Sequence, residues 1–386
     1  MDFVLSEEHR MLRDSVANFA EKELAPIAEE MDETDQWPEG LWKKLGDLGI
    51  NGITVDPEYG GAGADILSAS LACEEIARVC PAVALSWGAH ANLCCNNLNT
   101  NANETQKKNY LPKLCTGEHI GALGLTEPNA GSDAVSIATS ARREGDQYVV
   151  NGSKTFITNG PDAQTIVLYT KTDKEAGPRG ITAFILDTAF PGFSVSRRLD
   201  KVGNRGSQTG ELVMEDCAIP AENILGTENK GITVMMGGLD VERAFYSTYA
   251  LGIAEGAFAL ALKYSQERVQ FKRPIASFQF IQGKLADMYT EIEASRLLCY
   301  KAAIMAHEAK QGGKGTEVHQ ISSAAILFSA EMSIRVCEQA VQVHGGYGYC
   351  KEYPVQRFWR DAKLGTIGAG TSEIRRLVIA RELLKI

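Results

Sequence analysis

Hydrophobic and polar positions follow three successive patterns along the chain, with changes near residues 119 and 229. In the first segment apolar residues recur at the spacing of a helix face, whereas the middle segment contains short β-branched and aromatic runs between turns. Helical spacing then returns and continues to the end of the chain. We therefore predict a mostly α chain with a β middle domain, divided into a helical N-terminal domain (1–118), a small β domain (119–228) and a helical C-terminal domain (229–386).

Local signals place the elements within these segments. After an N-terminal helix capped by Ser6, the pattern predicts helices over 39–48, 66–79, 84–99 and 104–114. The β-rich runs predict a small antiparallel sheet or barrel with strands over 147–150, 153–157, 165–170, 180–186, 193–196 and 210–214. Asn151-Gly152 joins the first two runs and is the residue pair most typical of a two-residue hairpin.

The most unusual stretch is Gly238 to Arg243, followed by a long apolar segment from Ala244 to Val269. A helix that is apolar on nearly every face is buried in a larger body or a membrane. Polar residues and glycines interrupt the segment, so we predict a buried bundle helix. Glu242, at the head of this helix, has two interpretations: a general base whose pKa is raised by apolar surroundings, or an acid that complements the helix dipole. Local sequence alone favours the second.

Composition narrows the class of protein. With 386 residues, 44% hydrophobic and 23% charged, the chain is typical of a globular protein with two or three subdomains. The net charge of −10 argues against nucleic acid as the main partner. Nine unevenly spaced cysteines and six histidines form no zinc-type pattern, so we predict free thiols in a reducing compartment and no metal. Residues 1–8 have no features of a secretory signal.

Three loops are dense in small and polar residues: 124–133 (GLTEPNAGSD), 156–160 (FITNG) and 367–376 (IGAGTSEIRR). Short side chains and exposed backbone N–H groups suit close approach to a flat cofactor or a phosphate. Each loop alone is weak evidence, because ordinary turns use the same residues. The glycine-rich segment 59–65 lacks the preceding strand of a dinucleotide fingerprint and is interpreted as a plain loop.

Together and in this order, these stretches resemble the acyl-CoA dehydrogenase family over nearly the whole chain. The most specific motifs are TEPNAGSD (126–133), GGYGY (345–349) and Arg268-x-x-Phe271 ahead of Phe278-Gln279. The resemblance implies α,β-dehydrogenation of an acyl-CoA, a C-terminal four-helix bundle, and FAD held between the middle and C-terminal domains. It also implies a homotetramer, electron-transfer flavoprotein as electron acceptor and no membrane partner. The implied location is the bacterial cytoplasm or, for a mature chain, the mitochondrial matrix.

The resemblance also assigns roles to individual positions. Six residues correspond to FAD contacts within one subunit: Leu125, Thr126, Phe156, Thr158, Thr371 and Glu373. Six more correspond to contacts with the FAD of a neighbouring subunit: Arg268, Phe271, Gln279, Gln342, Gly345 and Gly346. Ser132 corresponds to a contact on the pantetheine or pyrophosphate side of the substrate, and Asp240 and Arg243 to contacts with its CoA end.

One departure from the family pattern concerns the catalytic base. Most members carry a glutamate directly before Gly-Thr-Ser in the third loop, where this chain has Ala369, which cannot accept a proton. The isovaleryl-CoA dehydrogenase branch instead carries its glutamate in Gly-Leu-Asp-x-Glu-Arg, which corresponds to Glu242. The resemblance thus favours Glu242 as the base over Asp240 and Glu373, and implies that the backbone N–H of Ala369 binds the enolate oxygen.

The acyl group that we expect is short and branched. An alanine at 369 leaves volume beside the α and β carbons, and Tyr246 lies one helical turn after Glu242 on the same face. We expect isovaleryl-CoA first and a cyclic or other bulky acyl-CoA second. An acyl-CoA oxidase that uses oxygen is an alternative redox class, and a non-redox CoA-binding protein is a third, against which Glu242 and the flavin loops count.

Overall fold

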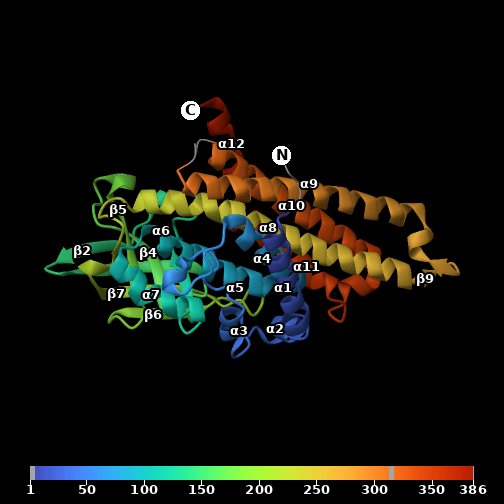
Figure 1. Cartoon of the computed structure of the whole chain (residues 1–386), viewed down its shortest axis with the longest axis horizontal. Coiled ribbons are helices and arrows are strands. Elements are labelled where there is room, and N and C mark those ends of the chain that lie inside the picture. The colour runs from blue at the N-terminus through green and yellow to red at the C-terminus, as the bar shows by residue number, and fades with distance from the viewer. Residues whose placement is uncertain (1–4, 313–316, 386) are drawn as a thin grey trace.

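The structure is a computed structural model that describes residues 5–312 and 317–385. A helical segment, a β sheet and a second helical segment follow one another along the chain, which confirms the predicted fold class. In Figure 1 the sheet lies at the left, the N-terminal helices lie below the centre, and the long helices α8 and α9 extend to the opposite end at β9. Residues 1–4, on which the signal-sequence expectation partly rests, lie outside the described residues.

The N-terminal helices begin at capping residues that the sequence displays. Ser6, Asp65 and Asn103 each accept a hydrogen bond from a backbone N–H in the first turn of α1, α4 and α7 respectively. The helices of this segment are α1 (Glu7–Phe19), α2 (Ala28–Thr34), α3 (Leu41–Asp47), α4 (Ile66–Val79), α5 (Pro81–Gly88), α6 (Asn97–Asn101) and α7 (Glu104–Thr116). The π-helical segment η3 (Ala89–Asn96) joins α5 to α6, so the predicted helix over 84–99 is one continuous run.

The middle segment forms an eight-stranded sheet in the order β6-β7-β3-β2-β4-β5-β8, with β1 paired to β4. Its strands are β1 (Gly121–Gly124), β2 (Ser140–Glu144), β3 (Gln147–Thr158), β4 (Thr165–Lys171), β5 (Ile181–Asp187), β6 (Phe193–Arg198), β7 (Thr209–Pro220) and β8 (Ile224–Leu225). The expectation of a wholly antiparallel sheet is wrong, because β1 runs parallel to β4. The sequence pattern does not predict β1, which is only four residues long.

The predicted hairpin at Asn151-Gly152 is also wrong. Both residues lie inside β3, and β7 pairs with β3 on either side of them, with a register shift between Val150 and Gly152. Glycine is required at this bulge because a Cβ on Gly152 would lie 2.5 Å from Oγ1 of Thr139. The actual hairpin joins β2 to β3, whose last and first residues, Glu144 and Gln147, face each other.

Helix α8 (Gly231–Glu267) is the central element of the C-terminal segment. It begins about three turns before Glu242, so the prediction that the Gly238–Arg243 stretch forms the helix head is wrong. The interpretation of Glu242 as an N-terminal acid that complements the helix dipole is therefore wrong as well. By length and composition α8 could cross a membrane, but 72% of its most apolar window is buried inside the protein.

The remaining C-terminal helices are α9 (Gln279–Lys310), α10 (Val318–His344), α11 (Val355–Ala362) and α12 (Ser372–Leu384), after a hairpin of β9 (Val269–Gln270) and β10 (Arg273–Pro274). A buried ion cluster fixes α9 against α4 and α8. In it Arg296 of α9 binds Glu74 of α4 and Glu255 of α8, and the hydroxyl of Tyr300 donates to Glu74 at 2.8 Å.

All nine cysteines are free thiols, as predicted.

Candidate active site

Glu242 lies on α8 and lines a small cavity where three parts of the fold meet. Helical segments η3 and α6 contribute Asn92, Leu93 and Asn97, the sheet region contributes Leu123, Leu125 and Tyr169, and α8 contributes the remaining wall. The cavity volume is about 10 Å³. The predicted base and Leu125, a predicted flavin contact, therefore share one cavity.

The pKa of Glu242 is raised to about 7, mainly because burial disfavours the charged carboxylate. The positive charges of Arg243 and Arg375 oppose this rise without cancelling it. A carboxyl group with a pKa near neutrality is matched to proton transfer at physiological pH. Glu373, the rival base, is exposed, and hydrogen bonds at the start of α12 hold its pKa below the usual value.

Asp240 is directed into a separate set of contacts, although it lies only two residues from Glu242. Its carboxylate accepts a hydrogen bond from Arg243 at 3.2 Å and lies 2.6 Å from Nδ1 of His319 on α10. Asp240 and Arg243 are both buried. The two residues expected at the CoA end of the substrate are thus bound to each other, and His319 is a partner that the sequence analysis missed.

The third loop turns sharply between η10 (Lys363–Thr366) and α12. Thr371 caps α12 by accepting a hydrogen bond from the N–H of Ile374 at 3.4 Å. Ala369 and Gly370 have φ values of 55° and 88°, a left-handed conformation that is uncommon for alanine. The predicted oxyanion donor, the N–H of Ala369, therefore belongs to a strained turn, as is frequent at functional sites.

Arg375 holds this turn in place. Its guanidinium donates to the carbonyl oxygens of Gly365 at 2.8 Å and Gly368 at 2.5 Å, and only 1% of the residue is exposed. The sequence analysis missed Arg375, because nothing in the pattern distinguishes it from its neighbour Arg376. Arg376 points outward and pairs with Glu331 at 2.7 Å.

Tyr246 lies one turn after Glu242 and is buried against the same loop. Its ring stacks on Tyr249 with the centroids 4.6 Å apart. Its hydroxyl has no hydrogen-bond partner in the described part of the chain and lies 3.6 Å from the position that a Cβ on Gly368 would take. The Tyr246 hydroxyl is therefore a buried polar group, between α8 and the third loop, whose hydrogen-bonding capacity the described residues leave unused.

The first two loops are tied to each other through a buried lysine. Lys154 of β3 donates to the carbonyl of Leu125 at 3.1 Å and to Glu127 at 2.7 Å, and the N–H of Thr155 donates to the carbonyl of Thr126 at 2.9 Å. Phe156 follows with φ of 59° and 69% of its surface exposed. Leu125, Thr126, Phe156 and Thr158 are thus brought together, with one large aromatic face held toward solvent.

The residues expected to reach a neighbouring subunit lie at the other end of the molecule, beside β9 (Figure 1). Arg268 packs over the ring of Tyr347 at 5.3 Å, which joins its loop to the GGYGY segment. Phe271 is 87% exposed, and Gln279 and Gln342 are exposed too. One protomer does not bring this group to Phe156, so the chain presents two separate half-sites.

These half-sites fit a large, flat, anionic cofactor. Gly131, Gly345 and Gly346 have no atom within 4 Å of the position of a Cβ, which leaves their backbones open to a ligand. Ser132 is exposed beside the first of these glycines. The guanidinium of Arg268 has no carboxylate partner among the described residues, and an arginine of this kind can bind a diphosphate through two hydrogen bonds.

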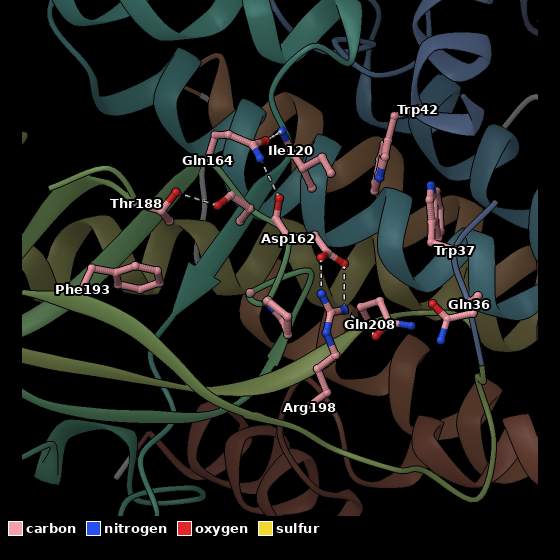
Figure 2. A pocket seen from close by; sticks show the side chains of 13 residues that line it. Gln36, Trp37, Trp42, Ile120, Asp162, Gln164, Thr188, Phe193, Arg198 and Gln208 are labelled. Carbon is pink, nitrogen blue, oxygen red and sulfur yellow. Dashed lines mark hydrogen bonds and ion pairs between the residues drawn. The ribbon is translucent and has the colours of Figure 1, made fainter. Parts of the chain in front are cut away.

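A larger hollow of about 820 Å³ lies between the N-terminal helices and the sheet (Figure 2). Trp37 and Trp42 stack at one side with centroids 4.6 Å apart, and Arg198 pairs with Asp162 at 2.5 Å at another. None of the predicted site residues is among the residues that line it. The predicted base, Glu242, and the predicted flavin contact Leu125 line the smaller cavity instead.

Comparison with known proteins agrees with this geometry. Models of the acyl-CoA dehydrogenase N-terminal, middle and C-terminal domains match residues 6–118, 122–217 and 229–384. Mitochondrial isovaleryl-CoA dehydrogenase of Solanum tuberosum is 48% identical over 99% of this chain and 92% of that protein. The short-chain-specific acyl-CoA dehydrogenase of Clostridium acetobutylicum is 46% identical over the full length of both.

Among solved structures, butyryl-CoA dehydrogenase from Megasphaera elsdenii superposes with a TM-score of 0.95 at 43% identity and covers both chains fully. The fold class, the family resemblance and the enzyme class are therefore confirmed. The chain belongs to the acyl-CoA dehydrogenase family, whose enzymes are flavoproteins that use FAD.

Proposed function

We propose that this enzyme dehydrogenates a short, branched acyl-CoA such as isovaleryl-CoA to the 2-enoyl-CoA, with Glu242 as the catalytic base. The observation that carries the proposal is the position of Glu242 on the wall of the buried cavity, with a pKa raised to about 7. Ala369 has no ionisable group that could compete for this role. Glu242 removes the α proton of the thioester.

FAD, when bound, supplies the acceptor for the hydride that leaves the β carbon. Phe156, Thr158, Leu125 and Thr126 would hold the flavin ring system, since they combine an exposed aromatic face with backbone groups on one surface. Thr371 and Glu373, at the start of α12, would hold its ribityl and pyrophosphate region, where the helix N-terminus favours negative charge.

Negative charge develops on the thioester oxygen when the α proton leaves, and the enzyme must stabilise it. The N–H of Ala369 is the donor that we propose for this role. Arg375 fixes the turn that carries this N–H, because its guanidinium donates hydrogen bonds to the carbonyl oxygens of Gly365 and Gly368. Arg375 is in this account a positioning residue.

The acyl pocket that we propose is short. Ala369 adds little volume where other family members carry a glutamate, which leaves room for a branch near the thioester. Tyr246 closes the same region with its ring, and its unpaired hydroxyl lies against the third loop. A long straight chain would have to displace this ring, and overpacking a buried site is unfavourable.

Assembly would complete the flavin site. We propose a homotetramer in which the half-site at β9 contacts the FAD of a neighbouring subunit through Arg268, Phe271, Gln279, Gln342, Gly345 and Gly346. The position of β9 at the opposite end of the molecule from the sheet supports this arrangement (Figure 1). Asp240, Arg243 and Ser132 remain proposed contacts of the CoA moiety.

We propose domain boundaries at 118/119 and 228/229. The first lies between α7 and β1, and the second lies just before α8. We propose electron-transfer flavoprotein as the electron acceptor. The nine free thiols suit a reducing compartment, such as the bacterial cytoplasm or the mitochondrial matrix.

The acyl preference can be tested by anaerobic bleaching of the flavin with isovaleryl-, isobutyryl-, butyryl-, octanoyl- and cyclohexanecarboxyl-CoA. We expect isovaleryl-CoA to bleach fastest and octanoyl-CoA to be poor, because Tyr246 shortens the pocket. The bleached state should persist in air and recover when electron-transfer flavoprotein is added. Preference for octanoyl-CoA would contradict the short pocket, and rapid recovery in air would indicate an oxidase.

The pH dependence of bleaching follows from the pKa of Glu242. Because the base acts only when ionised, kcat/KM should fall about tenfold per pH unit below about pH 7. Glu242→Gln should retain FAD and bind substrate, yet bleach about 10²–10⁴-fold more slowly, without this acid limb. A Glu242→Gln enzyme that bleaches at the wild-type rate would place the base elsewhere.

The positioning role of Arg375 can be tested with Arg375→Met. Two buried carbonyls would lose their donors, so we expect a loss of about 2–6 kcal/mol in stability and a lower midpoint of thermal unfolding. Loss of the positive charge should also raise the pKa of Glu242 and move the acid limb to higher pH. Arg376→Met is the matched control, because its surface ion pair contributes about 1 kcal/mol or less.

A further inference from the structure

The cavity beside Glu242 has a polar side that the proposed reaction does not use. Asn92, Asn97 and Tyr169 all lie on its wall, and all three are more than nine-tenths buried. Most of the other residues that line the cavity are apolar: Leu93, Leu123, Leu125, Met235 and Leu239. A buried polar group is costly unless it is hydrogen-bonded, so this concentration requires partners.

Two of these side chains have hydrogen-bonding capacity to spare. The hydroxyl oxygen of Tyr169 accepts a hydrogen bond from Nδ2 of Asn97 at 3.3 Å, which leaves the hydroxyl hydrogen available to donate. The amide nitrogen of Asn92 has no partner among the residues that the structure describes. Glu242, on the same wall, is a strong acceptor when ionised.

The volume of the cavity fits a single water molecule. About 10 Å³ is the smallest volume that accommodates one water molecule, and a buried water needs two to four polar partners. Tyr169, Asn92 and Glu242 provide two donors and one acceptor around that volume. A water can accept from the first two and donate to the third, so every spare group would be satisfied.

We propose that this cavity is a single-water site, and that Tyr169 is a positioning residue which acts on the carboxylate of Glu242 through that water. The inference rests on the proposed role of Glu242 as base. Water-mediated hydrogen bonds are nearly as favourable in enthalpy as direct ones. The water would stabilise the ionised base in the substrate-free enzyme and fix its orientation, and the acyl group would displace it.

The other charged or titratable groups around Glu242 come from a few elements. Arg243, Asp240 and Tyr246 belong to α8 itself, and Asp240 is engaged by Arg243 and by His319 of α10. Arg375 of α12 provides the second nearby positive charge. The residues that η3 and the β1 region place on the cavity wall do not titrate. Among the described residues that line the cavity, Tyr169 is the sheet residue whose side chain can donate a hydrogen bond, and its replacement by phenylalanine removes no charge.

Tyr169→Phe tests the positioning role in the FAD-loaded enzyme. Removal of the hydroxyl breaks the donor chain to Glu242, so the ionised base loses stabilisation and its pKa rises. The acid limb of kcat/KM should then move to higher pH by about one unit, with little change in kcat at high pH. Tyr148→Phe is the matched control, since Tyr148 is an equally buried tyrosine of the sheet that packs against Phe184 and does not line the cavity.

A limb that stays in place in Tyr169→Phe, or that moves equally in Tyr148→Phe, would overturn the positioning role. A high-resolution crystal structure of the substrate-free holoenzyme tests the water itself. We expect one ordered water within about 3 Å of Tyr169, Asn92 and Glu242, and its loss in Tyr169→Phe. A cavity without water would overturn the proposed water site. If the water is present but Glu242→Gln bleaches at the wild-type rate, the water site stands and the proposed role of Glu242 as base fails.

Discussion

The burial of one carboxylate inside a long helix is the constraint on which the active site depends. Glu242 lies within α8 rather than at its end, so the free N–H groups of the helix N-terminus do not solvate its charge. Burial raises its pKa to about 7, and the charges of Arg243 and Arg375 limit that rise. The surrounding fold keeps this balance, because α4, α9 and α10 enclose α8 and the ion cluster at Arg296 fixes two of them to it.

Three different elements of the fold carry the three parts of the proposed site. Strand β3 presents the exposed ring of Phe156, α8 presents the proposed base, and the strained turn at Ala369 presents a backbone N–H. Each part is anchored by a buried polar contact, from Lys154 to the first loop and from Arg375 to the third. Precise placement on rigid elements is what proton and hydride transfer require.

The sequence was informative where local chemistry decides structure and uninformative where distant contacts do. Helix α4 has the bounds that the sequence predicts, and a local hydrogen bond from the N–H of Ser68 to Asp65 caps it. No hairpin forms at Asn151-Gly152, because β7 pairs along β3 on both sides of these residues. The return of helical periodicity near residue 229 agrees with the start of α8 at Gly231, whereas the expected helix head at Gly238–Arg243 lies inside the helix. The loops and Glu242 could be found through family resemblance, but the role of Arg375 depends on carbonyls seven and ten residues away.

Removal of an α proton by Glu242 is the central claim, and it can be measured apart from hydride transfer. Acetyl-CoA has α hydrogens but no β carbon, so the reaction can proceed no further than proton exchange. In D₂O, the FAD-loaded wild-type enzyme should exchange the methyl hydrogens of acetyl-CoA for deuterium, as followed by NMR, and Glu242→Gln should exchange them no faster than the solvent does. Exchange by Glu242→Gln at the wild-type rate would contradict the account.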